Sequence, residues 1–285
     1  MRLVSGKTVS IRRFSYLIPT CALWALAVTP ATAEVRLAKG FTTLQFSSAP
    51  IAAKSTVRLH HWVLQRDGEP GSRIDLVLAA APKGRARVTI IPLARQGAGR
   101  VLFQSSGCPT GALVANGGFY LRDERGARPL GLLRANGQTL SPPSGRRFGG
   151  FLTSEGAGPS VLRRSQRDLA LSAKFAIESS PIVIEHGLSG IKTDNGERFD
   201  RVGVGVTREH ATVVAGAFAD EQNSVTLAEF ARLAASAITR VGERPADMLA
   251  MDGGPSAHLY VAGSAIFFGS KGAAYVPNVI CLDLR

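Results

Sequence analysis

Cysteine is scarce in this chain: only three occur among 285 residues, and no cluster of metal-ligand residue types stands out. His60 and His61 are adjacent, but neighbouring strand residues point to opposite faces and cannot easily share one ion. Internal repeats, heptads, low-complexity tracts and a nucleotide-type glycine-rich phosphate loop are also lacking. These absences exclude a repeat protein and a nucleotide-binding P-loop protein. We predict no cofactor and no metal; a divalent cation that assists a phosphate group stays open.

Acidic residues are few, with 21 Asp and Glu against 34 Lys and Arg, so the formal net charge is +13. This excess predicts an anionic partner, such as a phosphorylated or acidic glycan or an acidic envelope surface. Nucleic acid is disfavoured because the basic residues are spread along the chain without interleaved aromatic residues. The 45% hydrophobic content is typical of a globular protein. No clear linker divides residues 34–285, so we predict a single domain there.

The N-terminus has the composition of an export signal. Four basic residues precede or open an apolar stretch from Phe14 to Val28, and the small residues Ala31-Thr32-Ala33 follow it. The apolar stretch is too short for a membrane anchor. We therefore predict that residues 1–33 are cleaved after Ala33 and that the mature protein is periplasmic or secreted, with no stable membrane anchor. It would keep +9 of the +13 charge, since residues 1–33 hold four basic and no acidic residues.

Two cysteines remain once the leader, which contains Cys21, is removed. Cys108 and Cys281 form an even pair in an exported protein, which favours a disulfide between them. The alternative is two buried free thiols, because cysteine is often simply buried.

Short apolar or alternating runs separated by turns predict a strand-rich fold. The expected strands span 57–64, 74–78 and 88–91, with a strand or bent strand pair over 175–185 and a hairpin over 200–207 and 211–217. One helix is expected from the capping box at Thr226 and the helical spacing of apolar residues up to Gly242. We therefore predict an α+β fold: a mixed, strand-rich sheet core with few helices, one of which packs on the sheet.

Two strand ends share the same pattern, an apolar run that ends in a short polar residue and two glycines. One is Asn116-Gly117-Gly118 and the other is Asp252-Gly253-Gly254. Glycine lets a ligand approach the backbone, whose N–H groups can then face an anion or a sugar oxygen. The pattern predicts two walls of one site; the alternative is two unrelated turns.

These two motifs and Arg201-Val202-Gly203-Val204-Gly205, which lies between them, occur in an order that resembles the phosphodiester glycosidase family. This family includes the uncovering enzyme, an N-acetylglucosamine-1-phosphodiester α-N-acetylglucosaminidase, which removes N-acetylglucosamine from a phosphodiester cap on mannose 6-phosphate. The resemblance runs from about residue 113 to 282. The sequence departs from the family pattern at Pro255, where a third glycine is usual, and at Glu178-Ser179-Ser180-Pro181, where the family has Gln-Ser-Gly-Pro. Proline removes a backbone N–H, and Glu178 puts a carboxylate in place of an amide.

The linkage that such enzymes cut joins sugar C1 to a phosphate oxygen, and its chemistry suggests the roles of the residues. A phosphate monoester is a good leaving group, so the site needs a cation and N–H donors for the phosphate and a carboxylate beside the sugar. We expect the catalytic residues to be Asp252, Arg201 and Glu178. The expected substrate-binding residues are Asn116, Gly117, Gly118, Ser180, Gly253, Gly254 and Ser256.

Each assignment has a structural alternative. Arg201 could be an exposed or ion-paired arginine, and Glu178 a partly buried charge paired with an arginine. His258 is a possible proton shuttle, but a histidine in an apolar run is more often a hydrogen-bonded, half-buried one.

The leading functional hypothesis is an exported hydrolase that cleaves a sugar-1-phosphodiester of a glycan or envelope component. A non-catalytic periplasmic protein that binds an anionic glycan and a phosphodiesterase that cuts P–O are the alternatives.

Overall fold

The structure is a computed structural model that describes residues 36–52, 55–93, 107–123, 126–145, 149–155, 158–220, 224–269 and 276–284. The predicted leader and its cleavage site lie outside these ranges. Within them, no helix is long and apolar enough to cross a membrane.

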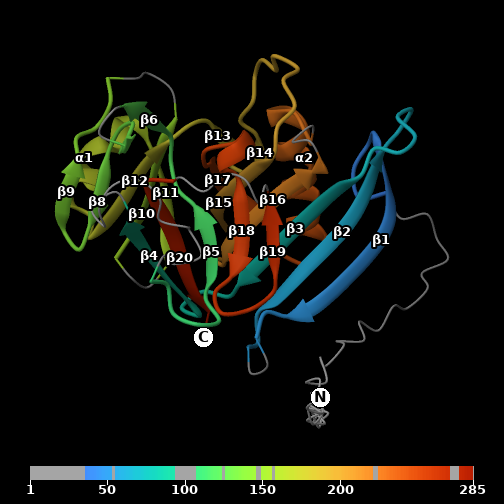
Figure 1. Cartoon of the computed structure of the whole chain (residues 1–285), viewed down its shortest axis with the longest axis horizontal. Coiled ribbons are helices and arrows are strands. Elements are labelled where there is room, and N and C mark those ends of the chain that lie inside the picture. The colour runs from blue at the N-terminus through green and yellow to red at the C-terminus, as the bar shows by residue number, and fades with distance from the viewer. Residues whose placement is uncertain are drawn as a thin grey trace, which may run out of the picture.

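The largest sheet has eight strands in the order β1-β2-β3-β16-β15-β17-β13-β14, and all its neighbours are antiparallel. Its long β1–β2 hairpin extends to one side of the molecule (Figure 1). The strands are β1 (Phe41–Pro50), β2 (Arg58–Arg66), β3 (Ile74–Ala81), β13 (Ile182–Glu185), β14 (Leu188–Ser189), β15 (Arg201–Thr207), β16 (Thr212–Ala219) and β17 (Pro245–Ala250).

Two five-stranded antiparallel sheets face this large sheet. The first has the order β19-β18-β5-β20-β4, with β4 (Ala86–Pro92), β5 (Leu113–Asn116), β18 (His258–Val261), β19 (Phe267–Gly269) and β20 (Asn278–Leu284). The second has the order β11-β10-β12-β8-β9, with β8 (Leu133–Ala135), β9 (Gln138–Ser141), β10 (Gly150–Ser154), β11 (Pro159–Arg163) and β12 (Phe175–Ser179). The strands β6 (Tyr120–Asp123) and β7 (Gly126–Pro129) form a separate two-stranded pair.

The central strands of the large sheet are buried on both faces, which explains why they are apolar almost throughout. Along β3, Val77 and Ala79 join a hydrophobic cluster with residues of both smaller sheets, whereas Leu76 and Leu78 join a cluster with the helix α2 (Leu227–Arg240). Successive strand residues point to opposite faces, so each face feeds its own core.

The helices of the described residues are short. The helix α1 spans Arg167–Ser172, and single 3-10 turns occur at Arg164–Gln166 and Gly254–Ser256. The helix α2 begins after Thr226, whose hydroxyl accepts the Glu229 N–H at 3.2 Å while the Glu229 carboxylate accepts the Thr226 N–H at 2.9 Å. This is the capping box that the sequence predicts.

The prediction of a strand-rich core with few helices is confirmed. The predicted hairpin over 200–217 is present as β15 and β16, which pair from Arg201–Ala217 to Val206–Thr212. The run 175–185 forms two strands, β12 and β13, in different sheets, with a cis Ser180–Pro181 peptide bond between them. All pairs in these sheets are antiparallel, and many join strands that are not consecutive in the chain, such as β3 with β16, β15 with β17 and β5 with β20. The sequence indicates only the pairs that form hairpins.

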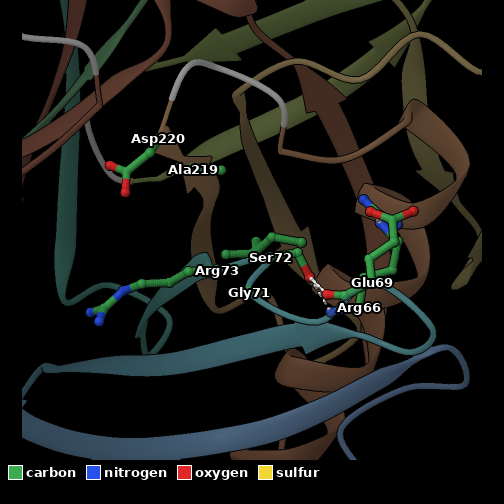
Figure 2. A pocket seen from close by; sticks show the side chains of 8 residues that line it. Arg66, Glu69, Gly71, Ser72, Arg73, Ala219 and Asp220 are labelled. Atoms are coloured by element: carbon green, nitrogen blue, oxygen red, sulfur yellow. Dashed lines mark hydrogen bonds and ion pairs between the residues drawn. The ribbon is translucent and has the colours of Figure 1, made fainter.

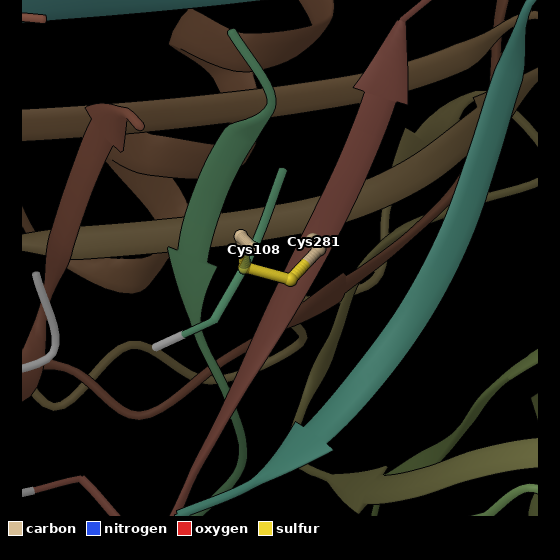
Figure 3. Close-up of a disulfide and its surroundings, with 2 residues drawn as sticks. All are labelled: Cys108 and Cys281. Atoms are coloured by element: carbon tan, nitrogen blue, oxygen red, sulfur yellow. A yellow bond between two sulfur atoms is a disulfide. The ribbon is translucent and has the colours of Figure 1, made fainter. Parts of the chain in front are cut away.

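Cys108 and Cys281 form a disulfide whose Cα atoms are 5.8 Å apart (Figure 3). It joins the segment that leads into β5 to the middle of β20, which is the neighbour of β5 in the sheet. The bond therefore cross-links the two strands that approach the Asn-Gly-Gly motif.

Candidate active site

The candidate site lies where the large sheet and the β5-containing sheet meet. β17 ends just before Asp252, and β15, its antiparallel neighbour, begins at Arg201, so both residues lie at the same edge of the large sheet. Asn116 ends β5, which pairs with β18 just beyond the Asp252 turn. The topology thus brings together three motifs that are far apart in the sequence.

Backbone and amide hydrogen bonds join the two glycine motifs directly. The Asp252 N–H donates to the Gly117 carbonyl at 3.0 Å, and the Asn116 Nδ2 donates to the Asp252 carbonyl at 2.8 Å. The Asn116 Oδ1 accepts the His258 N–H at 3.2 Å. Asn116 is fully buried, and in this structure its side chain holds the Asp252 turn in place through these hydrogen bonds. Direct contact between Asn116 and a substrate stays a prediction.

The glycines of the first motif are needed because other protein atoms approach them closely. A Cβ on Gly117 would collide with the Asn278 side chain, and one on Gly118 would collide with the Glu178 carbonyl. Neither residue has a positive φ, so close approach and not backbone conformation requires glycine there. Gly254 differs, because its φ of 59° is in the left-handed region that favours glycine.

Arg201 lies against the second motif. A Cβ on Gly253 would lie 3.1 Å from the Arg201 Nη1. The Arg201 Nη2 donates to the Glu197 carbonyl at 3.1 Å, and the guanidinium lies 5.2 Å from the Phe199 ring centroid. The ion pairs of the described residues include none to Arg201, and burial lowers its pKa despite nearby carboxylates. Arg201 is therefore a half-buried cation with donor capacity left for an anion.

Asp252 is a partly buried carboxyl group whose charge is incompletely balanced. Burial raises its pKa to about 6, although the Ser256 hydroxyl and the Gly253 N–H donate to it. Asp200, which the sequence interpretation did not single out, shows the same effect. Burial raises its pKa to about 6, and its Oδ1 accepts the Ala219 N–H at 2.9 Å. In the sequence, the feature that could have drawn attention to Asp200 is its position directly before Arg201.

Ser256 lies in the 3-10 turn that follows Asp252. Its hydroxyl is buried and lies 3.4 Å from the hydroxyl of Tyr120, a residue that the sequence interpretation did not single out. Pro255 is accommodated in the first residues of this turn, where a backbone N–H would have no partner within the turn. The Gly254 N–H is already used, because it donates to the Asp200 carbonyl at 2.9 Å.

Glu178 is placed differently from Asp252. Its buried carboxylate accepts the Leu132 and Ser144 N–H groups, each at 2.9 Å, and it also contacts the Ser144 hydroxyl and the Arg164 guanidinium. Burial raises its pKa, but the hydrogen bonds from Ser144 and Leu132 and the charge of Arg164 outweigh that effect, so the net shift is downward. Glu178 approaches the first glycine motif through its carbonyl, next to Gly118.

Ser180 and His258 are the remaining candidate residues. Ser180 is half-buried beside Gly149, and the carbonyl of the following Pro181 accepts the Ala250 N–H at 2.9 Å. His258 is fully buried, and burial lowers its pKa to about 3, so its ring is neutral at physiological pH. A role for His258 as a proton shuttle near neutral pH is therefore not supported.

A separate cavity of about 190 Å³ lies beside Ala219 and Asp220 (Figure 2). The buried Arg66 at its wall pairs with Glu229 and with Glu69, and the Arg66 N–H donates to the Ser72 hydroxyl. None of the sequence-predicted site residues lines this cavity. The buried charge of Arg66 is thus already paired with carboxylates, whereas the charge of Asp252 is incompletely balanced.

The fold and this site define a mostly antiparallel sheet protein with a carboxylate, an arginine and two glycine turns at one sheet edge. Residues 110–282 match the model of the phosphodiester glycosidase family, and the chain belongs to this family. No curated protein matches the chain.

Solved structures share the fold at low sequence identity. The catalytic domain of zebrafish N-acetylglucosamine-1-phosphodiester α-N-acetylglucosaminidase, auto-inhibited by its pro-peptide, has a TM-score of 0.59 and 16% identity, over 85% of this chain and 89% of that one. A hypothetical protein from Synechocystis has a TM-score of 0.53 and 12% identity, over 80% and 62%; the present chain thus spans less than two thirds of its length. A Burkholderia pseudomallei protein described as exported has a TM-score of 0.52 and 12% identity, over 74% of each chain.

Proposed function

We propose that this chain is an exported hydrolase that cleaves the bond between sugar C1 and a phosphate oxygen in a sugar-1-phosphodiester. Membership of the phosphodiester glycosidase family supports glycosidase activity on phosphodiester-linked sugars. The observation that carries the assignment to these residues is the hydrogen-bonded junction of Asn116, Gly117 and Asp252 with Arg201 against Gly253.

In the proposed reaction, Arg201 binds the phosphate, because a guanidinium offers two parallel donors to two phosphate oxygens. The phosphate monoester leaves with the electrons of the C1–O bond, and water adds to C1. The ionised Asp252 accepts the proton from this water and stabilises the positive charge that develops on the sugar. Ser256 and the Gly253 N–H hold the Asp252 carboxylate in place.

The substrate class is proposed from charge as well as from the site. The +9 charge predicted for the chain without residues 1–33 favours a phosphorylated or acidic glycan of the cell surface or envelope over a neutral one. Export is supported by the composition of residues 1–33 and by the disulfide, since disulfides persist in oxidising compartments. We also propose that the fold is of the α+β class, with α2 packed on the sheet that presents Asp252. In support, α2 shares a buried cluster with Met248 and Ala250 of β17.

The test is incubation of residues 34–285 with an N-acetylglucosamine-1-phosphodiester, followed by measurement of free sugar. Release by the wild type that is lost in Asp252→Ala supports the proposal. Binding without turnover would contradict it and indicate a glycan-binding protein. A sugar phosphate product would indicate cleavage of P–O, and oxygen-18 water would confirm which bond breaks, because the label enters the sugar only when C1–O is cut.

A further inference from the structure

Asn278, the first residue of β20, was not among the residues that the sequence brought to attention. Its backbone carbonyl accepts the Gly117 N–H at 3.1 Å, so it lies directly beside the first glycine motif. The Gly117 carbonyl in turn accepts the Asp252 N–H at 3.0 Å. One residue therefore separates Asn278 from the backbone of the proposed catalytic carboxylate.

The Asn278 side chain points at Gly117. Its Oδ1 occupies the space that a Cβ on Gly117 would need, and Ile177 closes the same space from β12. Because Gly117 has no positive φ, this approach is the structural reason for glycine at that position. The glycine motif therefore makes room for a carboxamide of the protein.

That carboxamide has no hydrogen-bond partner among the described residues. Asn278 is fully buried, yet neither its Nδ2 nor its Oδ1 is satisfied. An unpaired buried amide costs stability, and an apolar side chain of similar size would avoid this cost. A group of this kind in a native structure calls for a partner, such as an ordered water or a bound ligand.

We propose that Asn278 is a substrate-positioning residue, whose carboxamide gains its hydrogen bonds when a sugar phosphate binds at the Gly117–Asp252 junction. The proposal rests on the proposed function and deepens it. A carboxamide offers both a donor and an acceptor, which suits a sugar hydroxyl or amide substituent. Hydrogen bonds made only in the complex hold Gly117, and through it the Asp252 turn, in the geometry that the reaction needs.

The test compares Asn278→Leu with the wild type in melting temperature, in affinity for N-acetylglucosamine 1-phosphate by calorimetry, and in kcat and KM for the phosphodiester. We expect an equal or higher melting temperature, affinity at least about tenfold weaker and kcat/KM at least about tenfold lower. A merely structural role predicts the reverse, lower stability with unchanged affinity. Asn278→Ala is the second variant in case leucine does not fit.

Thr43→Val is the matched control. Thr43 also has an unsatisfied buried hydroxyl, but it lies in β1, far from β20 (Figure 1). This variant should leave affinity and kcat/KM unchanged. Wild-type affinity in both folded Asn278 variants would overturn the inference and leave the proposed function intact. A wild type that binds but does not cleave would overturn the proposed function alone, because the affinity comparison would still test Asn278; a wild type that does neither would overturn both.

Discussion

Two carboxylates on adjoining sheets, Asp252 and Glu178, are both shielded from solvent, and their surroundings are opposite in kind. Glu178 accepts two backbone N–H groups and contacts a hydroxyl and a guanidinium, so its charge is fully compensated. Among the described residues, the Ser256 hydroxyl and the Gly253 N–H donate to Asp252, and burial raises its pKa to about 6. A compensated carboxylate stabilises the fold, whereas an incompletely compensated one, in a glycine turn that Arg201 approaches at Gly253, is available for chemistry.

Removal of the uncompensated carboxylate should have the largest effect. We expect Asp252→Ala to lower kcat/KM for a sugar-1-phosphodiester by about 10²–10⁴-fold, because positioned proton transfer contributes about that much. Glu178→Gln, assayed at a temperature at which it stays folded, should retain activity within about tenfold. Steady-state kinetics of the two purified variants provide the measurement. Equal losses in both would break the distinction between the two carboxylates.

The stability of the same variants should show the opposite ranking. Glu178→Gln leaves the largely buried Arg164 guanidinium without its counter-ion and should lower the free energy of unfolding by about 2–4 kcal/mol. Urea denaturation at pH 7 measures this. Glu209→Gln is the control: its pair with Arg244 is exposed, so we expect no measurable change in the free energy of unfolding. A Glu178→Gln protein as stable as the control would contradict the account.

The two arginines can be compared in the same way. Arg201→Lys keeps the charge but loses the planar fork, so we expect kcat/KM to fall by about 10–100-fold, mainly through KM. Arg164→Lys should leave kcat/KM within about threefold, because Arg164 contacts Glu178 and the Ser144 carbonyl. The measurement is KM for the phosphodiester. If kcat/KM fell as much for Arg164→Lys as for Arg201→Lys, the assignment of the phosphate to Arg201 alone would be contradicted.

The pH dependence should differ in sign between the two carboxylates. The raised pKa of Asp252 means that the folded state holds its proton more tightly, so this group lowers stability as pH rises from about 4 to about 6. The lowered pKa of Glu178 means that its contribution is present above its ordinary value of 4.5 and is lost as pH falls below it.

Thermal unfolding at a series of pH values tests this for Asp252→Asn and Glu178→Gln. Each variant should lack the pH dependence of stability that its own carboxylate contributes. Activity should rise with an apparent pKa of about 6, because the reaction uses ionised Asp252. Asp200→Asn is the control, since Asp200 has a similar pKa but is not assigned to the reaction; loss of the activity step in that variant would move the step to Asp200.

The sequence predicts most of the individual strands and helices, but it predicts little of how the strands pair into sheets. Alternating apolar runs locate β2, β3 and β15, and the capping box locates α2 to within one residue. The bend at Ser180–Pro181 was visible as a proline in an apolar run. That β12 and β13 belong to different sheets was not, because sheet membership depends on contacts distant in sequence.

The site shows the same limit. The repeated glycine pattern identified Asn116 and Asp252, because strand ends and glycine turns are local features. The compensation of Glu178 by Ser144 and Arg164, and the position of Asn278 against Gly117, depend on segments that carry no motif of their own. Burial and hydrogen-bond partners, which only the folded chain defines, decide which of two carboxylates keeps an unbalanced charge.

The central claim is that a sugar phosphate binds between Arg201 and Asp252. A crystal structure of the protein with N-acetylglucosamine 1-phosphate tests it most directly. We expect the phosphate within hydrogen-bond distance of the Arg201 guanidinium and the sugar C1 facing the Asp252 carboxylate. A ligand bound instead at Arg164 and Glu178, or in the cavity beside Ala219 and Asp220, would contradict this account.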